Sequence, residues 1–304
     1  MIQWQTLDGR PTRIIAHRGA SGERPEHTRV GYELAIAQGA DLIEPDLVPS
    51  RDGVLFARHD AGLRRSTDIA RRAALAARSE RDRSGRHDWP VHHFRGDELA
   101  TLRALQPFGR RSRAFDSRFP LPRFEEVLDI AAAASAVGKR VGVYPELKHP
   151  AFFAEHGLDV TALCIELLRA RGHGGKLDPV WLQCFETEPL RRVHEALALP
   201  VFLLRESADL ADPAWLQALQ RTHPWLDGVA LPKSALIGAA GDAGLVRAAH
   251  DRGWQVHVWT LRDDQVMPGF ADVRGELRAL FDLGVDALFA DYPATAVAER
   301  VLNA

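Results

Sequence analysis

Short apolar runs rich in β-branched residues alternate along the whole chain with longer segments that have the apolar spacing of helices. This alternation from start to finish favours a parallel α/β fold. The apolar runs predict strands near residues 13–17, 41–47, 54–58, 140–146, 180–185, 200–204, 227–231, 254–260 and 286–290. The helical patterns lie near residues 26–38, 123–137, 158–171, 187–197, 209–221, 242–252, 274–283 and 294–302.

Nine strands are one too many for an eight-stranded barrel, and one turn in the sequence resolves the count. The segment Ser50-Arg51-Asp52-Gly53 has the signature of a tight Asp-Gly hairpin, which can join only antiparallel neighbours. The strand at 54–58 is therefore predicted to be the return arm of a hairpin that rises from the second strand. Eight parallel strands remain, and they predict a closed α/β barrel.

Residues 62–119 break this rhythm. The segment is dense in arginine, holds only short apolar patches, and is too long for an ordinary loop between a strand and a helix. We therefore expect a single barrel domain spanning 1–304, with an insertion at about 62–119 that folds over one rim. The insertion should be too polar for a large core of its own and should carry a short helix near 97–106. A solvated surface explains most of its arginines equally well.

Composition is that of an ordinary soluble protein, with 46% hydrophobic and 26% charged residues among 304 positions. The net charge of −2 gives no sign of a nucleic-acid partner, and no apolar run has the length of a membrane span. Residues 1–16 lack the pattern of a signal peptide, so we expect a cytoplasmic location, although a mature periplasmic protein would look the same. Cys164 and Cys184 lie in apolar runs and are expected to be buried free thiols. The oligomeric state stays open.

Polar side chains gather where several of the predicted strands end, and active sites of such barrels lie at those carboxyl ends. Paired charges two residues apart send both side chains to the same face of a strand. Each residue alone has an ordinary explanation, such as a cap, an ion pair or packing. Their joint position at one rim indicates a site. The residues are His17, Arg18, Glu44, Asp46, His59, Glu146, Lys148, Gln183, Trp259 and Thr260.

The carboxylates and cations of this set suit a metal ion and a phosphate. Glu44, Asp46 and Glu146 offer only oxygen ligands, which favours Ca²⁺ or Mg²⁺ over Zn²⁺. Arg18 and Lys148 would form an electropositive pocket beside the metal. A guanidinium matches phosphate oxygens with two donors, and lysine adds a point charge.

The two histidines complete the chemistry. His17 and His59 flank the predicted site and can deliver and remove protons near neutral pH. A metal, a cationic clamp and a histidine pair are what displacement at phosphorus requires. The residues therefore predict metal-assisted cleavage of a phosphate ester.

Longer motifs surround these residues in order along nearly the whole chain. They are Ala16-His17-Arg18-Gly19-Ala20-Ser21-Gly22, Arg24-Pro25-Glu26-His27-Thr28, Glu44-Pro45-Asp46, Asp52-Gly53, His59-Asp60, Tyr144-Pro145-Glu146-Leu147-Lys148-His149-Pro150, Leu182-Gln183-Cys184-Phe185-Glu186, Val256-His257-Val258-Trp259-Thr260-Leu261-Arg262, and Gly284-Val285-Asp286 to Asp291-Tyr292-Pro293. In this order they resemble the glycerophosphodiester phosphodiesterase family. The insertion resembles that of its longer, often exported and calcium-using bacterial branch.

The resemblance implies a TIM-type (β/α)8 barrel that hydrolyses glycerophosphodiesters to glycerol 3-phosphate and an alcohol. It implies one divalent cation on the three carboxylates, with Ca²⁺ favoured and Mg²⁺ still open, and His17 and His59 as acid and base. Trp259 and Phe185 would lie against the glycerol. The residues expected to bind substrate are Arg18, Lys148, Gln183, Phe185 and Trp259.

Three positions depart from the family pattern. His27 stands where many members have Asn, so it is either a third imidazole near the phosphate or a helix-start residue with local bonds. Cys184 replaces a common serine, which we expect to be a neutral packing change. Pro45 lies between two candidate ligands and removes a backbone donor, so it either fixes the shape of the strand or marks a bulge.

Two other functions are weighed against this one. A related barrel phosphodiesterase acting on lysophospholipid or phosphoinositide head groups would need apolar surface at the rim, whereas the insertion is rich in arginine. A phosphodiester-binding barrel without catalysis would have lost part of the set, whereas every member is present.

Overall fold

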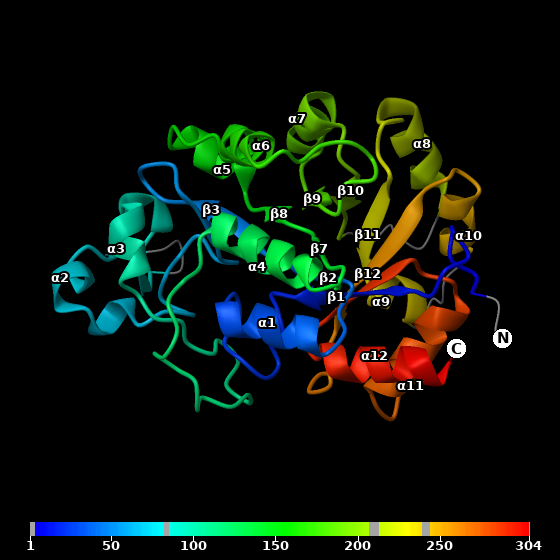
Figure 1. Cartoon of the computed structure of the whole chain (residues 1–304), viewed down its shortest axis with the longest axis horizontal. Coiled ribbons are helices and arrows are strands. Elements are labelled where there is room, and N and C mark those ends of the chain that lie inside the picture. The colour runs from blue at the N-terminus through cyan, green and yellow to red at the C-terminus, as the bar shows by residue number, and fades with distance from the viewer. Residues whose placement is uncertain (1–3, 82–84, 207–212, 239–243, 304) are drawn as a thin grey trace.

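Most strands of the computed structural model form one barrel sheet, with helices packed around it (Figure 1). The structure describes residues 4–81, 85–206, 213–238 and 244–303. The strands of the barrel sheet are β1 Arg13–His17, β2 Leu42–Glu44, β3 Asp46–Pro49, β4 Leu55–Ala57, β7 Gly142–Val143, β8 Glu146–Leu147, β9 Leu182–Cys184, β10 Val201–Leu204, β11 Gly228–Pro232, β12 Gln255–Leu261 and β13 Ala287–Ala290. Their order in the sheet is β4-β3-β8-β9-β10-β11-β12-β13-β1-β2-β7.

Two barrel strands are interrupted at a proline, which explains how this sheet makes an eight-stranded barrel. β2 and β3 are the two halves of one strand on either side of Pro45, and β7 and β8 flank Tyr144 and Pro145. β2 pairs with β7 and β3 pairs with β8, in both cases in parallel. Because β1 pairs with both β13 and β2, the sheet closes. The predicted TIM-type barrel is confirmed, and Pro45 marks a break in its strand.

The Asp-Gly turn forms the predicted hairpin. β4 pairs antiparallel with β3, with Leu47 opposite Ala57. Gly53 has a φ of +80°, a left-handed conformation that glycine adopts without strain. The return arm therefore carries the chain back toward the rim that holds the ends of β2 and β8.

Helices lie near all eight predicted positions. They are α1 Arg29–Ala37, α4 Phe124–Ala136, α6 Val160–Ala170, α7 Thr187–Leu197, α8 Ala214–Thr222, α10 Leu245–His250, α11 Val273–Asp282 and α12 Pro293–Leu302. The predicted beginnings of α8 and α10, near 209 and 242, lie outside the described residues. α1 begins three residues later than predicted, because His27 has a φ of 52° and the Thr28 hydroxyl caps the helix by accepting from the Gly31 amide. Two short helices, α5 Pro150–Glu155 and α9 Ser234–Ile237, were not indicated by the sequence pattern.

Alternation along each strand decides which side chains reach the barrel interior. Ile14 and Ala16 join the main apolar cluster between the sheet and the helices, whereas Ile15 belongs to a smaller interior cluster. Within the described residues no helix has the length and apolar character needed to cross a bilayer. The buried members of the interior cluster are Ile15, Leu42, Tyr144, Phe202, Leu204, Ala230, Ala287 and Phe289. His17 and Glu44 each follow one of these residues by two positions, so they lie above an apolar floor.

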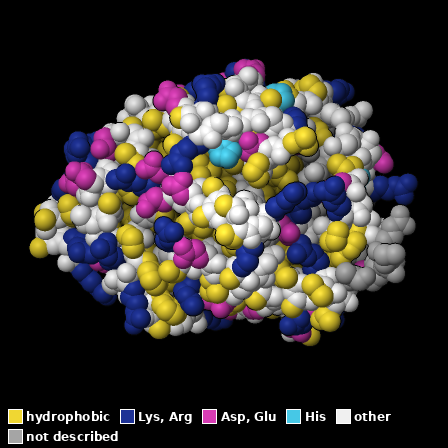
Figure 2. All heavy atoms as spheres, viewed as in Figure 1, with side chains coloured by type: hydrophobic (Ala, Val, Ile, Leu, Met, Phe, Trp, Pro, Cys, Tyr) yellow, Lys and Arg dark blue, Asp and Glu magenta, His cyan; other side chains and the backbone are white. Residues whose placement is uncertain are grey.

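The insertion lies at one end of the molecule, shown in cyan in Figure 1. It contains the short helices α2 Ala73–Ala76 and α3 Gly96–Ala100 and the hairpin β5 Glu80–Arg81 with β6 His87–Asp88. α3 accounts for the short helix predicted near 97–106. Figure 2 shows basic and acidic side chains interspersed over this end rather than one continuous basic surface.

The insertion has a second apolar cluster, which it shares with the β3–β4 hairpin and α5. Its short apolar patches converge on this cluster, so the segment packs without a large core wholly of its own. The buried members are Val48, Phe56, Leu63, Ile69, Trp89, Val91, Phe94, Leu99, Leu102, Ala104, Leu121 and Phe153.

Candidate functional site

The predicted site residues meet around one cleft of about 370 Å³ at the carboxyl ends of the barrel strands. Asp46 is buried beside it, in contact with Arg18 and Lys148. The other predicted site residues line the cleft, and they are His17, Arg18, Glu44, His59, Glu146, Lys148, Gln183, Phe185 and Trp259. Thr260, which was also predicted, lines the cleft as well, together with Arg65, Phe108, Leu204, Glu206, Arg262 and Phe289.

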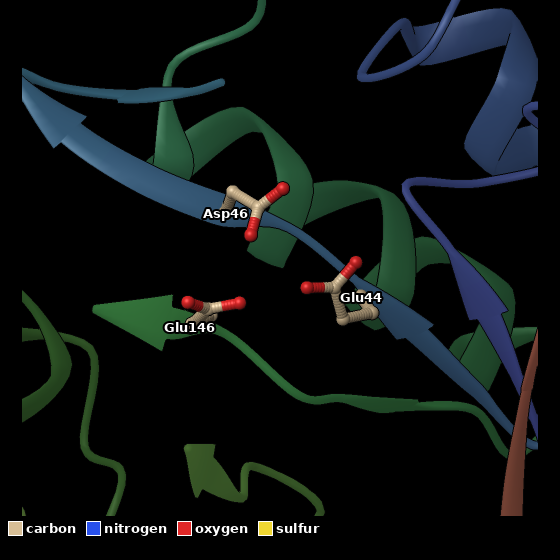
Figure 3. A group of neighbouring side chains, drawn as sticks. All are labelled: Glu44, Asp46 and Glu146. Atoms are coloured by element: carbon tan, nitrogen blue, oxygen red, sulfur yellow. The ribbon is translucent and has the colours of Figure 1, made fainter. Parts of the chain in front are cut away.

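Three carboxylates form the deepest part of the site. Figure 3 shows Glu44 and Asp46 pointing from one interrupted strand toward Glu146 on its neighbour. One oxygen from each lies within 4.8 Å of the others. Asp46 and Glu146 are direct partners in the pairing of β3 with β8, so the sheet register itself brings them together. All three side chains are buried.

The burial of three like charges shifts their protonation. Burial, reinforced by Asp46, raises the pKa of Glu44 well above its usual range. Burial also raises the pKa of Glu146 to about 8, against the opposing effect of Lys148. For Asp46, the cations Lys148 and Arg18 outweigh burial and hold the pKa well below its usual range. Asp46 is thus ionised, whereas Glu44 and Glu146 have too little positive charge around them to offset the effect of burial.

The residues fit a divalent cation. Asp46 Oδ1 is buried and has no hydrogen-bond partner, and Lys148 Nζ lies 3.7 Å from it. A cation beside Glu44, Asp46 and Glu146 would satisfy this oxygen and favour the ionised form of all three groups. The structure therefore contains a buried acidic triad that could hold a metal ion.

Two cations stand beside the triad. Arg18 donates from Nη1 to Glu26 Oε2 at 2.9 Å, and its Nε lies 3.1 Å from Asp46 Oδ2. Its backbone amide donates to Glu44 Oε2 at 2.9 Å. Lys148 donates from Nζ to Glu146 Oε1 at 2.8 Å. Burial opposes the charge on both side chains, but the surrounding carboxylates raise the pKa of each above its ordinary value. Both therefore stay positively charged at the wall of the cleft.

His17 lies at the end of β1 and is held by a carboxylate from the other end of the chain. Its Nδ1 lies 2.6 Å from Asp291 Oδ1. Burial, together with Arg18, lowers the pKa of His17 to about 4, although Asp291 opposes the shift. The imidazole is therefore neutral near pH 7. Because Asp291 is ionised and can only accept, the proton is on Nδ1 and the Nε2 lone pair is left for other partners.

His59 follows β4, and the hairpin brings it to the same cleft. Its Nδ1 lies 2.6 Å from Asp60 Oδ1, and 30% of its side chain is exposed. The His59 bond and charge overcome the effect of burial and lower the pKa of Asp60 to about 2. His59 therefore differs from His17 in being accessible to solvent and paired with a neighbouring carboxylate.

An amide and two aromatic rings complete the wall of the cleft. Gln183 Nε2 donates to Glu44 Oε1 at 3.3 Å, so it restrains one carboxylate of the triad. Phe185 and Trp259 meet edge to face, with ring centroids 6.2 Å apart. Phe185 is 47% exposed, which leaves an aromatic surface for the apolar part of a ligand. Cys184 is a buried free thiol, as is Cys164.

His27 supports the triad from behind. It is buried, its Nε2 lies 2.9 Å from Asp46 Oδ2, and its Nδ1 lies 2.8 Å from the Tyr32 hydroxyl. It does not line the cleft, and its bond to Asp46 is not local, so neither predicted alternative describes it fully. Its effect is to orient Asp46.

Sequence reasoning missed several residues that hold the site in place. Glu26, which holds Arg18, and Asp291, which holds His17, both stand inside quoted motifs, so the motifs carried a signal for them. Phe108, which lines the cleft, and Arg111, which binds Asp291, come from the insertion, and no spacing or motif indicated either contact. Only the three-dimensional course of the insertion reveals them.

Comparison with known proteins gives a consistent result. Residues 17–295 match the glycerophosphoryl diester phosphodiesterase family. A glycerophosphodiester phosphodiesterase of Haemophilus influenzae is 29% identical over 93% of this chain and 88% of its own length. One from Arabidopsis thaliana is 30% identical over 91% of this chain and 83% of its own. The fold matches that of an Oleispira antarctica phosphodiesterase in complex with the product sn-glycerol-3-phosphate, with a TM-score of 0.70 and 21% identity over 99% of this chain and all of that one.

Proposed function

The chain belongs to the glycerophosphoryl diester phosphodiesterase family, and on this premise we propose that it hydrolyses glycerophosphodiesters to glycerol 3-phosphate and an alcohol. The observation that carries the proposal is the meeting of three carboxylates, two cations and two imidazoles around one cleft. The product bound to the Oleispira antarctica phosphodiesterase agrees with it.

The proposal assigns one divalent cation to Glu44, Asp46 and Glu146. Three carboxylates favour Ca²⁺, because Mg²⁺ retains more water and usually binds through one or two carboxylates. When bound, the cation supplies positive charge that stabilises the negative charge developing on the phosphoryl oxygens. The preference for Ca²⁺, like the cytoplasmic location, stays a prediction.

Arg18 and Lys148 are proposed to bind the phosphate group. Glu26 and Asp46 fix the guanidinium of Arg18 from one side, so its remaining donors face the cleft in a set orientation. Lys148 adds a second positive charge. Donors held in place before the reaction need no reorganisation as charge develops, which lowers the barrier.

The two histidines are proposed to move the proton in opposite directions. His17 is neutral, and its Nε2 lone pair would take the proton from the attacking water as general base. His59 would donate a proton to the oxygen of the leaving alcohol, with its ring held in place by the contact of Nδ1 with Asp60 Oδ1 at 2.6 Å. The exposed position of His59 allows it to regain the proton from solvent.

Gln183, Phe185 and Trp259 are proposed to orient the organic part of the substrate. The rings of Phe185 and Trp259 would cover the carbon face of the glycerol, while the Gln183 amide stays anchored to Glu44. The edge-to-face arrangement keeps both rings in place at little entropic cost, because they pack on each other.

The test is release of glycerol 3-phosphate from glycerophosphocholine by the purified chain, followed with a coupled dehydrogenase. We expect activity that disappears in chelator, returns with Ca²⁺ or Mg²⁺, and is lost in Glu44→Ala and His17→Ala. Matched controls are Glu33→Ala, an exposed side chain on α1, and His223→Ala after α8, neither of which lines the cleft.

Full activity in Glu44→Ala or His17→Ala would defeat the assignment of the site. Faster cleavage of lysophospholipid vesicles than of glycerophosphodiesters would show that lysophospholipids are the preferred substrate class. Tight binding without turnover under any divalent cation would show a binding protein instead of an enzyme.

A further inference from the structure

One arginine of the insertion is buried at the catalytic end of the barrel. Arg111 is 5% exposed, although its neighbour Arg110 is exposed to solvent. Its Nη2 donates to Asp291 Oδ2 at 2.5 Å, and its Nε and Nη2 donate to the two oxygens of Asp264 at 2.8 and 3.1 Å. Its Nη1 donates to the Ser21 carbonyl at 3.2 Å. Such a set of partners fixes all three nitrogens of the guanidinium.

Asp291 is the important partner, because its two oxygens bind different residues. Oδ1 accepts from His17 Nδ1 at 2.6 Å. Oδ2 accepts from Arg111 and, at 2.9 Å, from Arg262 Nε. A carboxylate held at one oxygen by two guanidinium groups cannot turn about its own axis, so the other oxygen stays directed at the imidazole.

From this geometry we infer that Arg111 is a positioning residue for His17, and that the insertion supplies it. Arg111 fixes Asp291, and Asp291 fixes the ring plane and tautomer of the histidine. The inference rests on the proposed function for its kinetic part only, because the hydrogen bond between His17 and Asp291 exists whether or not substrate is bound.

Other residues of the insertion also hold it against the loop after β1. Gln106 Nε2 donates to the carbonyls of Ser21 and Arg24 at 3.1 and 3.2 Å. The Ser21 carbonyl is the one that also accepts from Arg111 Nη1. The Arg111 guanidinium lies 4.1 Å from the ring of Phe108, a residue that lines the cleft. The chain from 106 to 111 is thus anchored to the loop after β1, which is the strand that carries His17.

Arg262 alone is a weaker support for Asp291. It comes from the loop after β12, 23% of its side chain is exposed, and one of its donors goes to Gln265. The Arg111 side chain is 1% exposed, so its bond to Asp291 is shielded from water and from salt. Loss of Arg111 would leave Asp291 with one partly solvated guanidinium and with freedom to rotate away from His17.

The test compares Arg111→Gln with Arg110→Gln, which removes the same charge from the exposed neighbouring position. A displacement of a reacting group by about 1 Å lowers rates by roughly a hundredfold, so we expect kcat of Arg111→Gln to fall by about ten- to a hundredfold. KM should change by less than about threefold, since Arg111 does not touch substrate. Arg110→Gln should keep the kcat of the parent chain, and Arg111→Lys, which keeps a charged donor, should recover part of the loss.

A double-mutant cycle with Asp291→Asn separates positioning from general destabilisation. If Arg111 acts through Asp291, adding Arg111→Gln to Asp291→Asn lowers kcat no further. If the substitution only weakens the fold, its effect on kcat is the same with and without Asp291. Thermal melts of all variants give the folded fraction, and Arg111→Met serves if the glutamine variant does not fold.

A readout independent of activity is the NMR signal of the His17 Nδ1 proton, which a short bond to a carboxylate moves far downfield. The signal should be present in the parent chain and in Arg110→Gln, absent in Asp291→Asn, and shifted or broadened in Arg111→Gln. An unchanged signal together with an unchanged kcat in Arg111→Gln would overturn the inference. The signal could also be present in the parent chain and altered in Arg111→Gln while the parent chain releases no glycerol 3-phosphate. That result would overturn the proposed function and leave the positioning role standing.

Discussion

Binding of a divalent cation should release protons from the acidic triad. In the absence of a cation, burial and the charge of Asp46 place the pKa of Glu146 at about 8, and the pKa of Glu44 is also raised. A carboxylate ligates a cation in its ionised form, so the cation competes with the proton. Lowering the pH from 8 to 6 should therefore weaken the apparent affinity for Ca²⁺.

The size of the effect on Ca²⁺ affinity follows from the pKa of Glu146. A group with a pKa near 8 is half ionised at pH 8 and roughly 1% ionised at pH 6, so one such group weakens the apparent Kd roughly fifty-fold between these values. The number of protons released per cation should rise from about one half at pH 8 to about one at pH 6. The raised pKa of Glu44 adds to both the loss of Ca²⁺ affinity and the number of protons released.

The same shift fixes the sign of the stability effect. Because the folded-state pKa of Glu146 lies above its unfolded value, this group stabilises the cation-free chain at low pH, and that contribution is lost as pH rises toward 8. Saturating Ca²⁺ should therefore raise Tm more at pH 8 than at pH 6.

Titration calorimetry in two buffers of different ionisation enthalpy measures both affinity and proton release. Glu33→Gln, which changes an exposed carboxylate on α1, is the control and should behave as the parent chain. Equal Kd values at pH 6 and pH 8, with no proton released, would refute the reasoning from burial and like charge.

Three further predictions concern catalysis and stability. His17→Asn and His59→Asn should each lower kcat by about 10²- to 10⁴-fold, as removal of a general base or acid does, with cation affinity measured by calorimetry unchanged. Trp259→Ala should raise KM for glycerophosphocholine more than it lowers kcat, because the ring is proposed to contact glycerol; an unchanged KM in steady-state kinetics would contradict this contact. Phe94→Ala, in the apolar cluster of the insertion, should lower the free energy of unfolding by about 3–5 kcal/mol, because Phe94 is fully buried; urea denaturation tests this.

The sequence pattern was sufficient for the barrel and for most of the cleft. Two-residue alternation from Ile15 to His17 and from Leu42 to Glu44 follows from strand geometry alone, so the inward direction of these side chains was predictable. The Asp-Gly turn predicted the return of His59 because the turn chemistry permits only an antiparallel partner.

Contacts across long separations were not predictable in this way. Arg111 and Asp291 are 180 positions apart, and nothing in the local pattern distinguishes Arg111 from its exposed neighbour Arg110. The interrupted strand at Pro45 left two interpretations open, because only pairing on both sides of it shows a break in one strand. The apolar patches of the insertion looked too short for a core, since their partners come from β3, β4 and α5.

The central claim is that one divalent cation and one phosphate meet between the triad and the two cations of the cleft. A crystal structure of the chain with Ca²⁺ and glycerol 3-phosphate tests it most directly. We predict an ion within ligand distance of Glu44, Asp46 and Glu146, and phosphate oxygens in contact with Arg18 and Lys148. An ion bound elsewhere, or a phosphate that leaves Arg18 and Lys148 untouched, would contradict the account.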